Sequence, residues 1–317
     1  MDLYFENGKK RAYGLGNRGK LEFDSTGRLT DQIIDAYSRT GFYIFEDLLS
    51  NGEQIDLKTE FESLIRINSG LNSKPLEDNN IQKFSHDFDE TIFSYSKPLS
   101  DPFGGTSVAR GRYQAKMKEY EPPVGSPGKI VIGVGRCLEV LDSFLRLYGH
   151  PELLKVAENI NGRDFVPFRE SIWVKPAGLG TATAWHQDGT THWDNPCLDS
   201  GTHGFNFMAQ LYPTNPVNAL WIVPGTHNQG KINIRKLIEE NRGSDQLPDA
   251  VPMLCKTGDI AICNRQLLHA AFPNLSDTTR TTLVFGFHRR KSVLGVLGEA
   301  GKIYSKEIII NKRGRVR

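Results

Sequence analysis

The feature of this sequence that most constrains its fold is a series of short apolar runs in its second half. From Ser171 onward these runs are separated by Gly, Pro and Asn. Several short strands with turn residues between them are typical of a sandwich or jelly roll. The sequence therefore predicts a mainly β structure here, with strands at Ser171–Lys175, Thr181–His186, Phe205–Leu211, Ala219–Val223, Asp259–Cys263 and Thr281–Phe287.

The first half of the chain predicts helices instead. Thr30–Arg39 has a helical pattern, and the strand-like run Phe42–Phe45 follows it. Ser50 and Glu53 have the spacing of a capping box, in which each side chain accepts a hydrogen bond from the other residue's backbone N–H at the start of a helix. Cys137–Asn161 is again helical, with leucines on one face. We expect these helices to pack against one outer face of the β region.

Length and composition indicate an ordinary globular protein. The 317 residues suit one large domain, which we predict as a helical and loop-rich part at 1–165, a metal-binding β core at 166–290 and a C-terminal extension at 291–317. A net charge of +2 gives no reason to expect a nucleic acid partner, and no run approaches the ~18 apolar residues of a membrane span. Four cysteines without a close Cys-x-x-Cys pair favour a reducing compartment, so we expect a cytoplasmic location.

A candidate metal site begins at His186 and Asp188, in the string WHQD. Side chains two residues apart lie on the same face of a strand, so these two can point together. A histidine from a neighbouring strand would complete one face of an octahedron, a ligand set that suits Fe(II) and leaves three positions open. The string is short enough to occur by chance, and the alternative is a pair of ordinary polar residues in a sheet.

A second element strengthens the metal hypothesis. His269 follows the apolar run that opens at Gly258 and Asp259, and Arg280 comes at the start of the last predicted strand. A buried arginine at that place would need an anion. Its planar guanidinium matches a carboxylate with two parallel hydrogen bonds. The pattern thus indicates a metal site beside a carboxylate site.

Four strings in this order resemble the phytanoyl-CoA dioxygenase family of iron(II)/2-oxoglutarate oxygenases. They are WHQDG at 185–189, LWIVPGTHNQG at 220–230, GDIAICNRQLLHAAFPN at 258–274 and SDTTRTTLVFGF at 276–287. The resemblance covers roughly the C-terminal half strongly and the N-terminal half only in its general plan. It implies a double-stranded β-helix, which is a jelly-roll or cupin-like core, with flanking helices.

The resemblance also implies the roles of the site residues. His186, Asp188 and His269 would be the catalytic iron ligands, and Arg280 would bind the distal carboxylate of 2-oxoglutarate. Thr183 matches a position that faces the cosubstrate in related enzymes. Fe(II) would then be the cofactor, with 2-oxoglutarate and O2 as cosubstrates.

The implied reaction is hydroxylation of an unactivated C–H bond of a small-molecule metabolite, with release of succinate and CO2. Asp188 argues against halogenation, because related halogenases replace this carboxylate with Gly or Ala. One position departs from the family. A Ser or Thr often stands two residues after the second histidine, where this chain has Ala271. One hydrogen bond to the cosubstrate would then come from elsewhere or be absent.

Substrate contacts are expected in two segments. The stretch Gly189–Gly204 directly follows Asp188 and contains His192 and Trp193, so we expect it to act as a lid over the site. The basic segment that includes Arg112 would hold an anionic substrate, although solvated surface charge is the simpler interpretation of these arginines.

Other functions remain open at this point. The same cofactor site could perform desaturation, cyclisation or epoxidation in a biosynthetic pathway. A jelly-roll binding module with a vestigial metal site is the non-enzyme alternative, but a vestigial site has no reason to keep four matched residues. A zinc hydrolase would not require Arg280 and would need a general base nearby.

Overall fold

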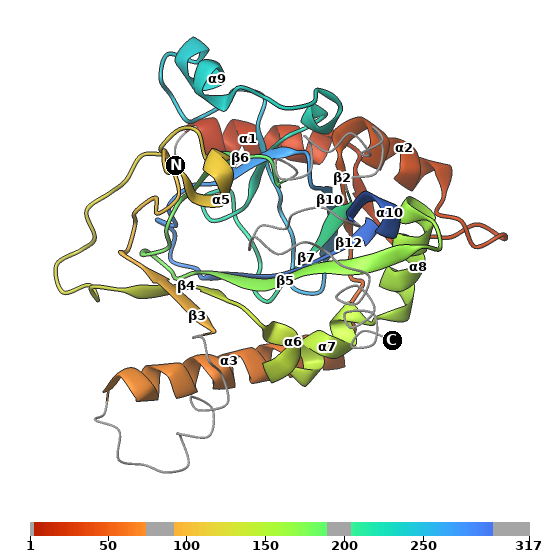
Figure 1. Cartoon of the computed structure of the whole chain (residues 1–317), viewed down its shortest axis with the longest axis horizontal. Coiled ribbons are helices and arrows are strands. Elements are labelled where there is room, and N and C mark those ends of the chain that lie inside the picture. Colours follow the sequence, from red (N-terminus) through yellow and green to blue (C-terminus); the bar gives the residue numbers. More distant parts are fainter. Residues whose placement is uncertain (1–2, 74–91, 189–203, 294–317) are drawn as a thin grey trace.

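Two β-sheets form the centre of the molecule in the computed structural model, which describes residues 3–73, 92–188 and 204–293 (Figure 1). The larger sheet has the strand order β1-β2-β10-β7-β12-β5-β4-β3, and the smaller sheet has the order β6-β11-β8-β9. Neighbouring strands are antiparallel, except that β1 pairs in parallel with β2. The mainly β second half is as predicted.

The strands differ in length and in how well the sequence predicted them. All six predicted runs form strands with slightly shifted ends, and β5 begins earlier than expected. The larger sheet contains β1 (Arg18–Gly19), β2 (Phe42–Phe45), β3 (Phe93–Ser96), β4 (Ile130–Val134), β5 (Phe165–Lys175), β7 (Phe205–Gln210), β10 (Ile260–Asn264) and β12 (Arg280–Arg289). The smaller sheet contains β6 (Thr183–His186), β8 (Trp221–Val223), β9 (Val251–Pro252) and β11 (Leu268–Ala271).

The predicted helices pack on one outer face of the β region, as expected, and two further helices cover the smaller sheet. The helices that pack on the larger sheet include the predicted ones, and they are α2 (Asp31–Thr40), α3 (Asn51–Ser73), α6 (Cys137–Val140), α7 (Asp142–Tyr148) and α8 (Pro151–Asn161). Three of them, α3, α6 and α7, lie below β5 in Figure 1. The unpredicted helices α1 (Leu3–Gly14) and α9 (Ile234–Glu240) pack behind the smaller sheet. The remaining helices of the described residues are two one-turn α-helices, α5 (Val108–Gly111) and α10 (Arg290–Val293), and the 3-10 helix η2 (Thr226–Asn228).

Local sequence signals explain where the predicted helices begin and end. α2 stops at Gly41, whose φ of 83° suits glycine. The capping box before α3 is confirmed: the Ser50 N–H donates to Glu53 Oε2 at 2.9 Å, and the Glu53 N–H donates to Ser50 Oγ at 3.3 Å. The helical run 137–161 is broken into three helices because Leu141 is extended and Pro151 starts a new helix. No helix in the described ranges is long and apolar enough to cross a membrane.

Strand alternation in the larger sheet decides which residues reach the interior. Phe207 pairs with Ile262 and Phe285 in register, and all three side chains join the core beneath the helices. The next position, Met208, instead belongs to the core between the two sheets. Side chains on the Met208 face therefore look toward the smaller sheet, and the candidate site lies in this space.

Candidate active site

His186, Asp188 and His269 come together between the two sheets, and all three are buried. The two histidines are register partners on β6 and β11, and their ring centroids are 4.0 Å apart. His186 Nε2 lies 3.6 Å from Asp188 Oδ1, and one potential ligand atom from each residue lies within 4.8 Å of the others. These donors could hold one metal ion.

The reason expected for the meeting of His186 and Asp188 is wrong. We expected strand alternation to place them on one face, but β6 ends at His186. Asp188 lies after the strand, where its backbone N–H donates to the Arg265 carbonyl at 2.9 Å. The chain segment between β10 and β11 therefore holds the backbone of Asp188 in place.

A bulge in β6 sets which of its side chains face the interior. His269 pairs with His186, but Ala271 pairs with Thr183, so three residues of β6 span two of β11. The extra residue places Thr183 and His186 on the same face, although they are three positions apart. Trp185 points the other way into the core behind the smaller sheet and donates its indole N–H to the Asp245 carbonyl.

Backbone carbonyls orient both imidazole rings. Nδ1 of His186 lies 2.8 Å from the Ala184 carbonyl, and Nδ1 of His269 lies 2.8 Å from the Leu267 carbonyl. Each Nδ1 therefore carries the proton and each Nε2 is left as a ligand. Burial lowers the pKa of His186 well below its ordinary value, and His269 and Arg112 lower it further. A neutral imidazole is the form that binds a metal, so this donor set fits Fe(II).

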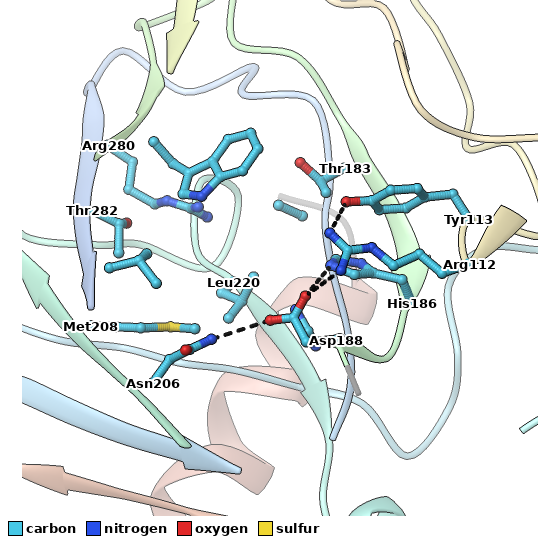
Figure 2. Close-up of a pocket in the computed structure, with 14 residues that line it drawn as sticks. Arg112, Tyr113, Thr183, His186, Asp188, Asn206, Met208, Leu220, Arg280 and Thr282 are labelled. Carbon is cyan, nitrogen blue, oxygen red and sulfur yellow. Dashed lines mark hydrogen bonds and ion pairs between the residues drawn. The ribbon is translucent and has the colours of Figure 1, made fainter. Parts of the chain in front are cut away.

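Two side chains from distant elements contact the Asp188 carboxylate. Asn206 Nδ2 donates to Oδ2 at 3.1 Å, and Arg112 Nη1 forms an ion pair with Oδ1 at 3.1 Å (Figure 2). Arg112 was expected as a substrate contact or a solvated charge, and the structure excludes the second interpretation because its side chain is 4% exposed. Asn206 was not predicted, since only the pairing of strands brings it to the site.

Arg280 projects into the same pocket from the start of β12, on the larger sheet. Its side chain is buried, and Nη1 donates to the Asn218 carbonyl at 3.0 Å. Arg280 has no carboxylate partner among the described residues, and burial lowers its pKa to about 10. A desolvated guanidinium needs a counter-ion, so this end of the pocket fits an anion such as a carboxylate.

The pocket between these groups is continuous and partly apolar. Figure 2 shows Arg280 and Thr282 on one side of it, with Arg112, Tyr113 and Asp188 on the other. Trp173 on β5 also faces this pocket. The lining residues are Arg112, Tyr113, Trp173, Thr183, His186, Asp188, Asn206, Met208, Leu220, His269, Ala271, Arg280, Thr282 and Val284.

Lys175 is a further buried basic residue near Arg280 that the sequence did not single out. The two residues are register partners on β5 and β12. Lys175 Nζ donates to the Thr181 carbonyl and to the Phe272 carbonyl. Burial lowers its pKa well below the ordinary value, and Arg280 lowers it further. The Lys175 side chain therefore ties β5 to the residues just before β6 and just after β11. The predicted substrate contacts His192 and Trp193 lie outside the described residues.

Comparison with known sequences identifies a family. The family model described as phytanoyl-CoA dioxygenase (PhyH) matches residues 37–282, which is most of the chain. A phytanoyl-CoA dioxygenase of Arabidopsis thaliana is 24% identical over 277 residues, which cover 80% of this chain and 87% of that protein. The likeness thus extends through both the helical first half and the β core.

Solved structures show the same fold. EctD from S. alaskensis with 2-oxoglutarate and 5-hydroxyectoine superposes with a TM-score of 0.60 at 16% identity, covering 92% of this chain and 86% of that one. EctD with bound Fe gives a TM-score of 0.57 at 15% identity, with 90% and 82% covered. These likenesses confirm the predicted double-stranded β-helix with flanking helices.

Proposed function

The chain belongs to the phytanoyl-CoA dioxygenase family of iron- and 2-oxoglutarate-dependent oxygenases, and we propose that it hydroxylates an unactivated C–H bond of a small-molecule metabolite, with release of succinate and CO2. The observation that carries this proposal is the buried His186, Asp188 and His269 cluster in the same pocket as Arg280. A metal-binding triad beside a buried cation without a carboxylate partner among the described residues suits a metal and a dianionic cosubstrate.

We assign His186, Asp188 and His269 as the iron ligands. Two neutral imidazoles and one carboxylate occupy one face of an octahedral ion and leave the other face for 2-oxoglutarate and O2. When bound, the iron supplies the oxidising chemistry together with these cosubstrates. The protein contributes the fixed direction of each Nε2, which the Ala184 and Leu267 carbonyls secure.

We assign Arg280 as the anchor for the distal carboxylate of 2-oxoglutarate. A guanidinium with a buried, unpaired Nε can receive that carboxylate through two parallel hydrogen bonds. Thr183 lines the same pocket from the bulged strand and would face the cosubstrate. Ala271 presents only a methyl group there, so it offers no hydrogen bond, and Trp173 supplies an apolar wall that excludes water.

The pocket also suggests a chemical class for the substrate, which the family assignment alone does not provide. We propose an anionic substrate that contacts Arg112, because this buried cation lies at the metal side of the pocket rather than at the Arg280 side. His192 and Trp193 remain proposed substrate contacts, since the chain connects them closely to Asp188.

Spectroscopy of the metal complex tests the proposed ligands directly. Anaerobic protein with Fe(II) and 2-oxoglutarate should develop a weak visible charge-transfer band. His186→Ala, Asp188→Ala and His269→Ala should each lose it, whereas His150→Ala, which alters a histidine beside Glu53 on the helical side, should keep it. Retention of the band in all three ligand variants would exclude this ligand set.

The reaction is tested by succinate release with a library of metabolites in air. A substrate should stimulate succinate formation, and the mass of its product should increase by one oxygen atom. Loss of two hydrogens, without added oxygen, would instead indicate desaturation or cyclisation at the same site. Retained metal and 2-oxoglutarate binding with no turnover of any library member would favour the vestigial binding module.

A further inference from the structure

A second cleft lies on the opposite face of the larger sheet from the proposed active site. Its volume is about 710 Å³, within the range of roughly 300–1,000 Å³ that is typical of small-molecule sites. Helix α3, which lies below β5 in Figure 1, forms one wall, and residues at or just beyond the ends of β5, β7 and β12 form the other. Among the described residues the cleft and the active-site pocket share no lining residue, so the cleft is a separate space.

Strand alternation explains how the two spaces come to lie back to back. Arg280 and Thr281 are consecutive residues of β12, so their side chains leave the sheet on opposite faces. Arg280 lines the active-site pocket, whereas Thr281 lines the cleft. Val174, the register partner of Thr281, belongs to the core on the helical side of the sheet. The cleft therefore lies directly behind the residue that we assign to 2-oxoglutarate.

The walls of the cleft are mostly apolar. Phe61 and Ile65 are four residues apart on α3, so they lie on one face of that helix and look toward the strand ends. An apolar surface of this size that stays open to water is unfavourable in itself, and such surfaces commonly mark ligand sites. The apolar residues that line the cleft are Phe61, Ile65, Val174, Pro176, Tyr212 and Pro213.

One polar group of the cleft lacks a partner. Thr281 is fully buried, and its Oγ1 has no hydrogen-bond partner within the described residues. Neighbouring threonines differ, because Thr282 Oγ1 donates to Gln210 Oε1 at 2.8 Å and Thr279 Oγ1 accepts the Ala177 N–H at 3.2 Å. A buried hydroxyl without a partner is uncommon in folded proteins. A polar atom of a ligand in the cleft would supply the partner that Thr281 lacks.

The charges on α3 indicate which kind of polar ligand fits. Glu62 accepts the Tyr212 hydroxyl at 2.8 Å, and its carboxylate lies 3.9 Å from Lys58 Nζ. Arg66 lines the same cleft one turn later on α3, and its hydrogen bond in the described part of the chain goes to Ser63 Oγ at 3.0 Å rather than to a carboxylate. The charge of Glu62 is thus matched by Lys58, and Arg66 leaves the cleft with one positive charge that an anionic group can neutralise.

We propose that this cleft binds a small, mostly apolar molecule that carries one anionic group. The apolar part of the ligand lies between Ile65 on α3 and Val174 on β5, and its anionic group lies beside Arg66. The dianion 2-oxoglutarate has too little apolar surface to fill these walls. The inference goes beyond the proposed oxygenase activity and does not depend on it, because no residue of the cleft belongs to the active-site pocket.

Two fluorescent probes with the same aromatic skeleton test the proposed charge. Anilinonaphthalenesulfonate carries one sulfonate, and phenylnaphthylamine is its neutral counterpart. The wild type should bind one molecule of either. Arg66→Gln should weaken binding of the sulfonate by about 3- to 5-fold, the size of an exposed ion pair, and should leave the neutral probe unchanged. Arg163→Gln alters another exposed arginine and should bind both probes like the wild type.

A pair of substitutions on α3 tests the position of the site. Ile65→Glu should weaken binding of both probes by roughly 10-fold or more, because it places a carboxylate in the apolar wall. Ile67→Glu makes the same change on the same helix at an exposed residue that does not line the cleft, so it should bind like the wild type. The proposal is wrong if the wild type binds neither probe, or if Ile65→Glu and Arg66→Gln both match it.

Competition experiments separate this site from the proposed active site. Saturation with 2-oxoglutarate and Co(II), a redox-stable substitute for Fe(II), should not displace either probe, and Arg280→Ala should keep both affinities. Displacement would place the probes in the active-site pocket and overturn the inference. Probe binding that falls as the protein concentration rises would also overturn it, since a second copy of the chain would then cover the cleft. Failure of the iron ligands in the charge-transfer test leaves these results unaffected.

Discussion

Asn206 and Asp188 are joined by a hydrogen bond in which the amide Nδ2 donates to the carboxylate Oδ2 at 3.1 Å. Both residues are buried; Asn206 lies on β7 of the larger sheet, and Asp188 follows the end of β6. The bond occupies the oxygen that faces away from His186, so it leaves Oδ1 directed toward the proposed metal position. Asn206 is thus a positioning residue for the proposed ligand.

Removing this amide should weaken metal binding without unfolding the protein. We expect Asn206→Ala to lower the affinity for Co(II) by roughly 10- to 100-fold, the usual effect of losing a partner of a metal ligand. The exposed Asn228 offers a matched control, Asn228→Ala, which should bind like the wild type. Equal cobalt affinity in Asn206→Ala would show that the hydrogen bond does not position Asp188.

Gly286 makes room for Asn206, which leads to a second prediction. A Cβ at Gly286 would lie 2.6 Å from Asn206 Oδ1 and 2.9 Å from the Phe205 carbonyl oxygen. Gly286→Ala should therefore lower the free energy of unfolding by about 1–3 kcal/mol, as overpacking does, and weaken metal binding. Gly128→Ala meets no atom within 4 Å and should change neither quantity in urea unfolding and cobalt titration. Unchanged values for Gly286→Ala would contradict the steric argument.

Arg280→Ala should raise the KM for 2-oxoglutarate by roughly 10- to 1,000-fold, because losing one partner of a buried charge pair costs about 2–5 kcal/mol. Co(II) affinity should stay at the wild-type value, since Arg280 contacts no triad residue in any described interaction. Succinate release at varied 2-oxoglutarate measures the first quantity, and Arg163→Ala serves as the control. An unaltered KM would mean that another residue anchors the cosubstrate.

The lowered pKa of His227 leads us to predict that the stability of the protein depends on pH. Burial lowers the pKa of this imidazole below its ordinary value, although the Ser38 carbonyl 3.1 Å from Nε2 opposes the shift. Below a pH of about 6.5, His227 therefore becomes protonated in the unfolded chain while it stays neutral in the folded protein. The free energy of unfolding should fall as the pH decreases from about 6.5 toward the lower folded pKa, and it should fall less in His227→Gln. Urea unfolding at several pH values measures this difference, and identical slopes would contradict it.

Much of the proposed chemistry was readable from residue types and local pattern. The strings around His186, Asp188 and His269 indicated a metal site. They also resembled the phytanoyl-CoA dioxygenase family, and the match of that family's model to residues 37–282 agrees with this resemblance. Apolar runs bounded by Gly, Pro and Asn predicted all six strands correctly, because the burial of a strand requires apolar residues that are close together in the sequence. Helix ends followed local capping signals in the same way.

Only the tertiary structure decided how these groups face one another. The bulge that turns Thr183 and His186 to one side depends on the pairing of β6 with β11, which lies far along the chain. The contacts of Arg112 and Asn206 with Asp188 likewise join elements distant in sequence. Local periodicity reports which face of an element is buried, but not which residue of another element will lie opposite. The sequence by itself therefore predicted a metal site and named its three proposed ligands. The packing of the two sheets decided which side chains orient the Asp188 carboxylate and which one neutralises its charge.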